Sequence, residues 1–515
     1  MLDGAGHPAG IAAALALFCA LAAGSAGAGN EAPFEILPLR ARGRALAALE
    51  VATAPGPAAP DLMVVYVEGS PPDERRRLDL FRLEPGATEL SPRLSLAMPP
   101  QAVAFDVGDV HPAPGDELLL LSRRALEIRS LAAGAPLLQR VALDPPAPLP
   151  PRMRSFSRMP LVADWSGKGS PELLLPSLDG AQLQALKPGA EPRTLHMPIL
   201  TEYFTPTPGP PPYDGILEAT FEWPALTLAD DDGDGRADLF ALGRYGVDVF
   251  RSNGSGPPAE PTRSMPLRPF RADEELRYET TRARLFARDL DGDGLADLVV
   301  HRSSGRLFGS HATTEIHHNP GNGASIARTA NASLTVDAGV ADLELVDLDG
   351  DGRVEVFHSM MRMGLVQVLR FLTTRRAEVE LRVFSLRPPG IQGAEEVWHG
   401  EVALAFNLEE GRVAGLLPNA DGDWNGDGIR DLLYGIGRDS LALHLGRGGE
   451  RGPGFDERVA SQKIPSASWL AVVDADADGL QDLVIYDDWL TEDGAHLLRN
   501  RGILPGTSPS LRPAN

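Results

Sequence analysis

The sequence contains almost no cysteine: among 515 residues there is only Cys19, which lies in an apolar run near the N-terminus. If that run is removed on export, the mature chain has no thiol and cannot form a disulfide. Aromatic residues are also scarce, at 6% of the chain, whereas the 54 glycines and 46 prolines exceed the usual share. Stability must therefore come from a core and from hydrogen-bonded sheets, with bound metal as a further candidate, and the chain must turn often.

Positive charge is in short supply as well. The chain has 48 Lys and Arg against 71 Asp and Glu, which gives a formal net charge of -23. A nucleic-acid-binding surface needs a basic patch that displaces counterions from phosphates, so this balance argues against nucleic acid as a partner. Because many of the acids are concentrated in a few short segments, cations are the better partner.

The apolar run from Ile11 to Gly24 has 14 residues, fewer than the roughly 20 that a membrane helix needs. Small residues follow it, as at a signal cleavage site, although residues 1–10 lack the Lys or Arg of most such signals. We predict a signal peptide at 1–28 and a secreted, periplasmic or cell-surface protein without a membrane span. Lipid attachment at Cys19 is an alternative that the bulky Phe18 before it disfavours.

What the sequence does have is an internal repeat. A nine-residue pattern of Asp and Gly recurs in nearly the same spelling at 230–238, 289–297, 347–355, 423–431 and 474–482. We call these segments the five acidic loops. Such self-similarity at a fixed period is typical of repeat architectures.

Worn copies of the pattern extend the series towards the N-terminus. They start at Asp164 and, with an insertion, at Asp106, and a fainter one ends at Asp61. Successive copies from Asp106 onwards are 51 to 76 residues apart. In Asp164-Trp-Ser-Gly-Lys168 a lysine replaces the acid of position 5, and we expect its ammonium group to occupy the ion's place. The copies before Asp230 are therefore predicted to be free of metal.

Each acidic loop lies between two stretches that resemble β-strands, such as Ala225–Leu228 before and Leu239–Leu242 after the first one. A second pair of strands usually follows, and four short strands per unit are typical of a propeller blade. We predict an all-β fold, a β-propeller of seven to eight blades over residues 34–503, with eight favoured by the unit count. Phe34–Leu39 would complete the last blade, and 504–515 would form a Pro-rich tail.

No long helical periodicity interrupts this pattern, and the long connections are rich in proline, as at 145–151 and 206–212. The run 305–331, with His311, His317 and His318, could hold a metal or catalytic cluster. A solvated loop insertion is the preferred interpretation.

Within each acidic loop, oxygen-bearing side chains occupy positions 1, 3, 5 and 9, while positions 4 and 6 are mostly glycine. Glycine permits the sharp bends that wrap a chain around one ion. Calcium fits this donor set best, because it accepts six to eight oxygen ligands in flexible geometry, whereas zinc favours Cys or His. An EF-hand is excluded, since position 12 is not Glu in any of the five. The predicted ligands of about five Ca²⁺ ions are Asp230, Asp232, Asp234, Asp238, Asp289, Asp291, Asp293, Asp297, Asp347, Asp349, Asp351, Glu355, Asp423, Asn425, Asp427, Asp431, Asp474, Asp476, Asp478 and Asp482.

The fourth loop, with Val413-Ala-Gly415 before it and Leu432-Leu-Tyr-Gly435 after it, resembles the FG-GAP or VCBS repeat family, which includes the integrin α-chain propellers. The resemblance covers about residues 45–500. It implies calcium at positions 1, 3, 5 and 9 and a role in extracellular recognition or adhesion. The integrin type has seven blades and literal Phe-Gly and Gly-Ala-Pro words, most of which are missing here.

Catalytic motifs are missing too: there is no His-Glu-x-x-His, no Gly-x-Ser-x-Gly and no phosphate-binding glycine loop with lysine. Acid pairs outside the repeats, Glu409-Glu410 and Asp487-Asp488, are interpreted as solvated surface. We therefore expect a monomeric module that binds an extracellular protein or glycan and has no catalytic residues. A propeller-type hydrolase or lyase acting on polysaccharide is the alternative. Tryptophans could stack on sugars, but core packing is the preferred interpretation of Trp165, Trp223, Trp398, Trp424, Trp469 and Trp489.

Overall fold

The computed structural model describes residues 32–506 apart from short internal gaps. The predicted signal peptide, most of the predicted tail, Glu409-Glu410, Asp488 and Trp489 lie outside the described residues. The gaps are at 41–42, 54–58, 70–72, 85, 150–155, 188–189, 198, 205–217, 244–245, 268–280, 305–310, 322–325, 327–328, 338–339, 363, 388–390, 409–411 and 488–493.

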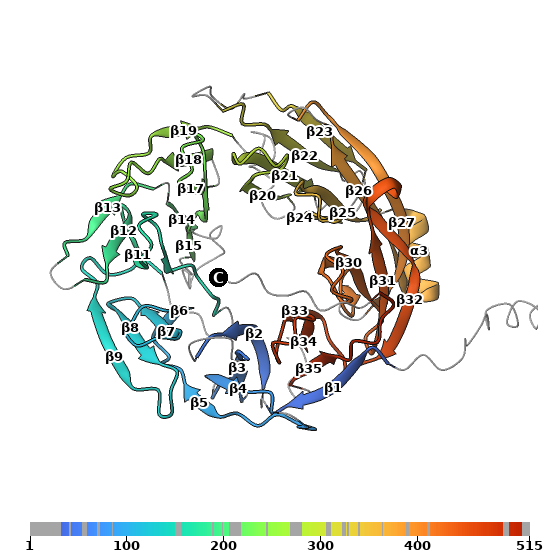
Figure 1. The fold of residues 1–515 in the computed structure, drawn as a ribbon, viewed down its shortest axis with the longest axis horizontal. Coiled ribbons are helices and arrows are strands. Elements are labelled where there is room, and N and C mark those ends of the chain that lie inside the picture. The colour runs from blue at the N-terminus through green and yellow to red at the C-terminus, as the bar shows by residue number, and fades with distance from the viewer. Residues whose placement is uncertain are drawn as a thin grey trace, which may run out of the picture.

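Eight antiparallel sheets follow one another around a ring, so the unit count that favoured eight blades is confirmed (Figure 1). Blades 1 to 4 contain β2 (Arg44–Val51), β3 (Asp61–Glu68), β4 (Arg75–Phe81) and β5 (Leu94–Ala97); β6 (Ala102–Gly108), β7 (Glu117–Ser122), β8 (Ala125–Ser130) and β9 (Leu137–Ala142); β10 (Val162–Ala163), β11 (Glu172–Ser177), β12 (Gly180–Ala185) and β13 (Arg193–Leu195); β16 (Ala225–Ala229), β17 (Asp238–Gly243), β18 (Gly246–Phe250) and β19 (Arg263–Met265).

The remaining blades continue the ring. Blades 5 to 8 contain β20 (Thr281–Arg288), β21 (Asp297–Ser304), β22 (Ala312–His317) and β23 (Ala332–Val336); β24 (Val340–Val346), β25 (Glu355–Met361), β26 (Arg376–Leu386), β27 (Ala394–Asn407) and β28 (Arg412–Ala414); β29 (Asn419–Gly422), β30 (Asp431–Gly437), β31 (Ser440–Arg447) and β32 (Gly454–Lys463); β33 (Trp469–Val473), β34 (Asp482–Tyr486), β35 (Ala495–Asn500) and β1 (Phe34–Leu39).

The ring is closed by its N-terminal strand. β1 pairs antiparallel with β35, with Phe34 opposite Asn500 and Leu39 opposite Ala495, which confirms the predicted closure. Phe34 is buried and packs edge-to-face on Trp424 of blade 7, with 5.9 Å between ring centroids. Its backbone N–H donates to Gln462 Oε1 at 3.0 Å, and its carbonyl accepts from Gln462 Nε2 at 2.8 Å. The closing strand therefore ties blade 8 to blade 7.

The core is divided among the interfaces between blades. Between its ends, the second strand of a blade is apolar and buried on both faces, as in β3 and β11, because each blade packs against two neighbours. Eight apolar clusters each join two adjacent blades, including the pair formed by the first and the last blade. Leu504 is buried in the cluster between blades 7 and 8, so core packing extends one residue past the predicted boundary at 503.

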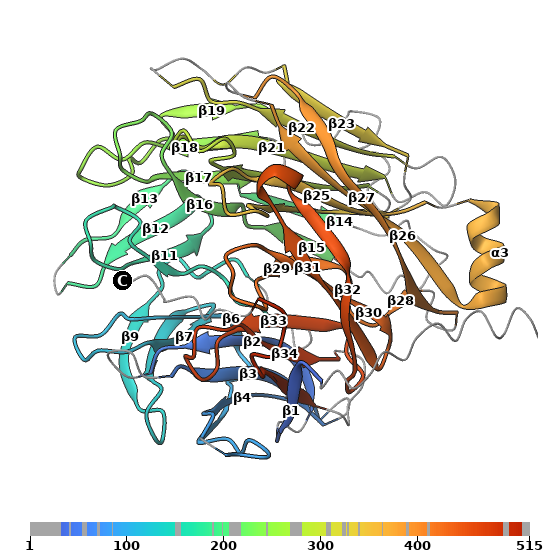
Figure 2. The same cartoon turned by 45° about the vertical axis from the view of Figure 1, so that its right-hand side comes forward.

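Three features depart from the simple four-stranded repeat. A separate hairpin of β14 (Leu200–Phe204) and β15 (Glu218–Glu222) stands between blades 3 and 4, where a Pro-rich insertion was predicted. Blade 6 has a fifth strand and the helix α3 (Leu365–Thr374), which lies at the outer rim (Figure 2). The helix was not expected from the sequence. None of the described helices is long and apolar enough to cross a bilayer.

The interpretation of 305–331 as a solvated loop insertion is wrong in part. Residues Ala312–His317 form β22, the third strand of blade 5, and Ala312, Ile316 and His317 are buried. Ala312, Thr314 and Ile316 are buried and alternate with the less buried Thr313 and Glu315, which is the period of a strand.

Candidate metal centres

All five acidic loops occupy the same place in their blades. They connect the first strand to the second in blades 4 to 8, for example β20 to β21 and β33 to β34. Because equivalent connections lie at the same end of every blade, the loops share one face of the ring. Both glycines of the second loop have positive φ angles, 78° at Gly292 and 87° at Gly294. Residues with a side chain rarely adopt this conformation.

The loops bring their acidic side chains together. In four of the five, ligand atoms of three acidic side chains lie within 4.8 Å of one another. These groups are Asp230, Asp232 and Asp234; Asp289, Asp291 and Asp293; Asp347, Asp349 and Asp351; and Asp474, Asp476 and Asp482. In the remaining loop, Asn425 donates to Asp427 Oδ2 at 2.9 Å and to the Pro505 carbonyl at 3.2 Å, while the Asp427 N–H donates to Asp423 Oδ1 at 3.2 Å.

The first acid of a loop fixes the backbone bends. Asp289 accepts the N–H of Gly292 on one carboxylate oxygen and the N–H of Gly294 on the other, both at 2.8 Å. Asp230, Asp347 and Asp423 make the same pair of bonds. The loop is therefore folded by its own hydrogen bonds into a turn with converging side chains.

The acid at position 9 is buried and joins two loops. It is the first residue of the second strand, and one of its oxygens accepts the N–H of loop position 2, as in Ala475 to Asp482 at 2.9 Å. In four blades the other oxygen accepts an N–H beyond or at the end of the third strand, at 2.7 Å in every case. Burial raises the pKa of Asp482 to about 8 and that of Asp431 to about 7. A bound cation would favour the ionised carboxylates.

The structure shows this buried acid in all eight blades. The worn copies retain it at the first residue of β3, β7 and β11, although their loops have lost other acids. The eight residues are Asp61, Glu117, Glu172, Asp238, Asp297, Glu355, Asp431 and Asp482, and all are buried. The repeat is therefore eightfold in its anchoring carboxylate and fivefold in its full acidic loop.

Arginine side chains neutralise the buried acid of blade 1. Asp61 accepts hydrogen bonds from Arg82 Nε at 2.9 Å and Nη2 at 3.0 Å, and further bonds from Arg93 and Thr53. These donors hold the pKa of Asp61 below its ordinary value although burial alone would raise it. The buried charge is thus neutralised by the chain itself.

Two details of the worn copies differ from prediction. Asp106 lies within strand β6, where it accepts from Arg158 Nε at 2.8 Å and from the Leu161 N–H at 2.7 Å, so it does not begin a loop. The Lys168 ammonium group donates to the Ser255 carbonyl oxygen of blade 4 at 2.8 Å. That contact directs it to a neighbouring loop, whereas the prediction placed it at the centre of its own.

His318 lies at the second acidic loop, whereas from the sequence it was named only in the metal or catalytic cluster that was not the preferred interpretation. Its Nδ1 lies 3.1 Å from Asp297 Oδ1 and 3.6 Å from Asp291 Oδ2. These three side chains form a further group with ligand atoms within 4.8 Å. Imidazole is a ligand for zinc and other transition metals, so the second loop offers a mixed donor set. The histidine run was visible in the sequence, but nothing there indicated that strand β22 returns to the loop.

The tryptophans mainly serve packing. Trp165 and Trp424 are buried in clusters between blades, and Trp398 packs edge-to-face on Phe455. Trp469, by contrast, has 54% of its surface exposed.

Two FG-GAP-like repeats match this chain, at residues 230–300 and 289–358, which include the first three acidic loops. No curated protein matches the chain in sequence. Among solved structures, a lectin from Agrocybe aegerita that recognises non-reducing terminal N-acetylglucosamine is similar at 13% identity. That alignment covers 89% of this chain and 86% of the lectin, with a TM-score of 0.38.

Two further solved structures are similar to this chain. The V. cholerae biofilm matrix protein Bap1 is 11% identical over 92% of each chain, with a TM-score of 0.42. The WD40 domain of SCAP from fission yeast is 13% identical over 81% of this chain and 94% of that domain, with a TM-score of 0.27. The chain is therefore an eight-bladed β-propeller that contains FG-GAP-like repeats over residues 230–358, which is consistent with the resemblance expected from the sequence.

Proposed function

We propose that this chain is a calcium-stiffened binding module that acts outside the cytoplasm on a protein or glycan ligand. The observation that carries the proposal is the convergence of three acidic side chains in each of four loops on one face of the ring. Carboxylates this close repel one another, and a divalent cation relieves the repulsion.

Calcium is favoured because the predicted ligands at positions 1, 3, 5 and 9 are oxygens of Asp, Asn or Glu. Positions 1, 3, 5 and 9 of the five loops supply 19 carboxylates, and filling five sites would change the formal charge from -23 to -13. Extracellular calcium modules work with dissociation constants of about 10⁻⁴–10⁻³ M, which suits loops that are folded but strained by repulsion.

The ions would act on the binding face indirectly. In each loop the backbone N–H of position 2 donates to the buried acid of position 9. In four blades that acid also accepts a backbone N–H at or just beyond the C-terminal end of the third strand. An ion in the loop therefore stiffens two connections of a blade at once. Connections at the opposite end remain available to present a ligand surface.

Array binding of the purified mature chain tests the proposal. We expect binding to immobilised glycans or extracellular proteins that is stronger in calcium than in EDTA, without release of reducing ends. The D291A/D293A double variant should weaken calcium-dependent binding. Asp179, an exposed acid in the turn between β11 and β12, lies away from the acidic loops and provides the control D179N, whose binding should keep the calcium dependence of the parent chain. Release of reducing ends would instead support the polysaccharide-acting enzyme.

A further inference from the structure

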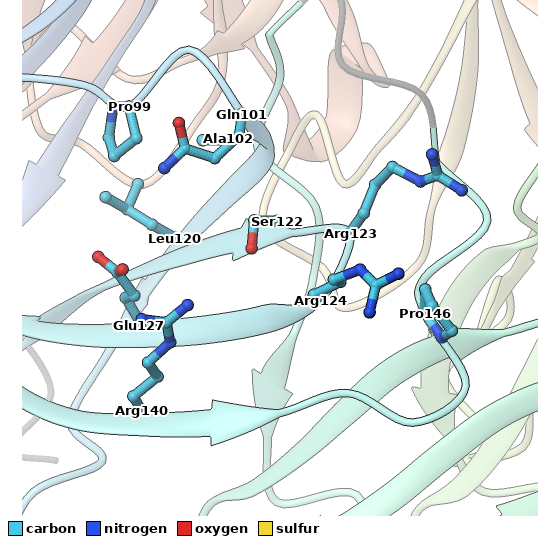
Figure 3. Close-up of a pocket in the computed structure, with 10 residues that line it drawn as sticks. All are labelled: Pro99, Gln101, Ala102, Leu120, Ser122, Arg123, Arg124, Glu127, Arg140 and Pro146. Atoms are coloured by element: carbon cyan, nitrogen blue, oxygen red, sulfur yellow. The ribbon is translucent and has the colours of Figure 1, made fainter.

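A pocket of about 310 Å³ opens between blades 1 and 2. Strand β7 begins with the buried Glu117 at the end of the acidic loops and finishes at Ser122, so the turn from Ser122 to Ala125 lies at the opposite end of the ring. Figure 3 shows Arg123 and Arg124 at this turn, with Pro99 and Gln101 across the pocket. The pocket is therefore separate from the acidic loops.

Three guanidinium groups line the pocket of a chain whose net charge is strongly negative. Arg123 and Arg124 are exposed in the β7–β8 turn, and Arg140 is exposed on β9. Within the part of the chain that the structure describes, none of the three makes an ion pair. Glu127 also lines the pocket, but its carboxylate is paired with Arg129 at 2.9 Å. The pocket thus has an excess of positive charge.

The remaining lining combines apolar and polar side chains from three adjacent strands and two connections. Leu120, Glu127 and Arg140 lie opposite one another on β7, β8 and β9, so their side chains share one face of the sheet. Pro99 and Pro146 add apolar surface, and the amide of Gln101 can donate and accept hydrogen bonds. The Ser122 hydroxyl donates to the Ala125 carbonyl at 2.8 Å and so fixes the turn at the rim.

A buried arginine fixes the backbone at one side of the pocket. Buried Arg76 of blade 1 donates to the carbonyls of Pro99 at 3.2 Å, Pro100 at 2.8 Å and Ala102 at 2.9 Å. Its guanidinium also lies over the Phe156 ring, 4.5 Å from the centroid. A buried arginine committed to one short segment preorganises that segment, which reduces the cost of ordering it around a ligand.

We propose that this pocket binds an acidic saccharide, a sugar ring that carries a carboxylate. This inference rests on the proposed binding function and names its ligand class. Arginine forks match a carboxylate in two parallel hydrogen bonds, and a pyranose ring has an apolar face that fits Leu120 and the prolines. The amide of Gln101 and the carboxylate of Glu127 match sugar hydroxyls, which a simple inorganic anion lacks. A peptide strand would use a free sheet edge, and these lining groups are side chains.

Calorimetric titration of the full mature chain in calcium tests the pocket with three probes: trigalacturonate, neutral galactotriose and triglutamate. We expect trigalacturonate to bind and the other two to bind at least about tenfold more weakly. R124A and R140A should each weaken trigalacturonate binding by about tenfold, the usual cost of one charge-assisted contact. R451A removes an exposed arginine of blade 7 and is the matched control, with unchanged affinity expected.

Three outcomes would overturn the proposal: no binding of trigalacturonate, equal binding by the parent chain and the R123A/R124A/R140A variant, or equal affinity for triglutamate. The last result would assign the pocket to acidic peptides. Melting of the same variants with and without EDTA reports on the acidic loops alone. An unchanged melting temperature in EDTA would count against calcium, whereas the titrations of the arginine variants decide whether the pocket binds the saccharide.

Discussion

Chelation of divalent ions should lower the melting temperature of this propeller by about 7 °C. An ion present at tenfold above its dissociation constant stabilises the folded chain by about 1.4 kcal/mol, so five acidic loops give about 7 kcal/mol. The propeller extends from Phe34 to Asn500, about 470 residues, and unfolding entropy near 2.1 cal/mol/K per residue gives about 1 kcal/mol/K. Dividing the free energy by this entropy gives the shift.

Differential scanning calorimetry in millimolar calcium, in EDTA and in magnesium measures this shift. Single-loop variants such as D291N should each lose about one fifth of it, because the loops lie in different blades and act independently. D179N should melt like the parent chain in all three buffers. A shift in EDTA below about 1 °C would refute the reasoning, since it would mean that the loops stabilise the ring without ions.

Three further results are expected. F34A should destabilise the ring by about 3–5 kcal/mol in denaturant titrations, because it removes a buried ring that packs on Trp424 and weakens closure. Burial raises the pKa of Asp482 from 3.8 to about 8, so the ion-free folded chain binds a proton that the unfolded chain releases, and its stability falls as the pH rises between these values. In EDTA the melting temperature should therefore be higher at pH 5 than at pH 8. This difference in melting temperature should be smaller in D482N. R82M leaves the buried Asp61 with fewer cationic partners and should lower the melting temperature equally in calcium and in EDTA.

Much of the architecture could be predicted because the repeat marks the same connection in every blade. Position 9 of each acidic loop is the first residue of a buried strand, so the position of Asp238 or Asp431 in the sequence sets the register of a blade. The closing strand Phe34–Leu39 was also predictable, because the last blade needs a strand from the N-terminus to close the ring.

The features that could not be predicted depend on contacts between residues that are far apart in sequence. Asp106 looks like the start of a loop in sequence, but only the fold shows that Arg158 and a backbone N–H bind its carboxylate within a strand. His318 approaches Asp297 because β22 returns antiparallel to β21, and the histidine run alone did not reveal that pairing. Helix α3 occurs in one blade only, so the sequence repeat could not predict it.

The arginine pocket was invisible for a similar reason. Arg123 and Arg124 are adjacent in sequence, but Arg140 joins them only through the pairing of β8 with β9. Among 48 Lys and Arg residues, these three arginines form no recognisable sequence motif, and only the fold shows that they line one cavity.

Counting the metal ions per chain tests the central claim most directly. Native mass spectrometry of the mature chain after dialysis into calcium, compared with the D291A/D293A variant, gives that number. We predict about five calcium ions on the parent chain and about four on the variant. A parent chain that carries no divalent ion, with the variant indistinguishable from it, would contradict the claim that the acidic loops are ion sites.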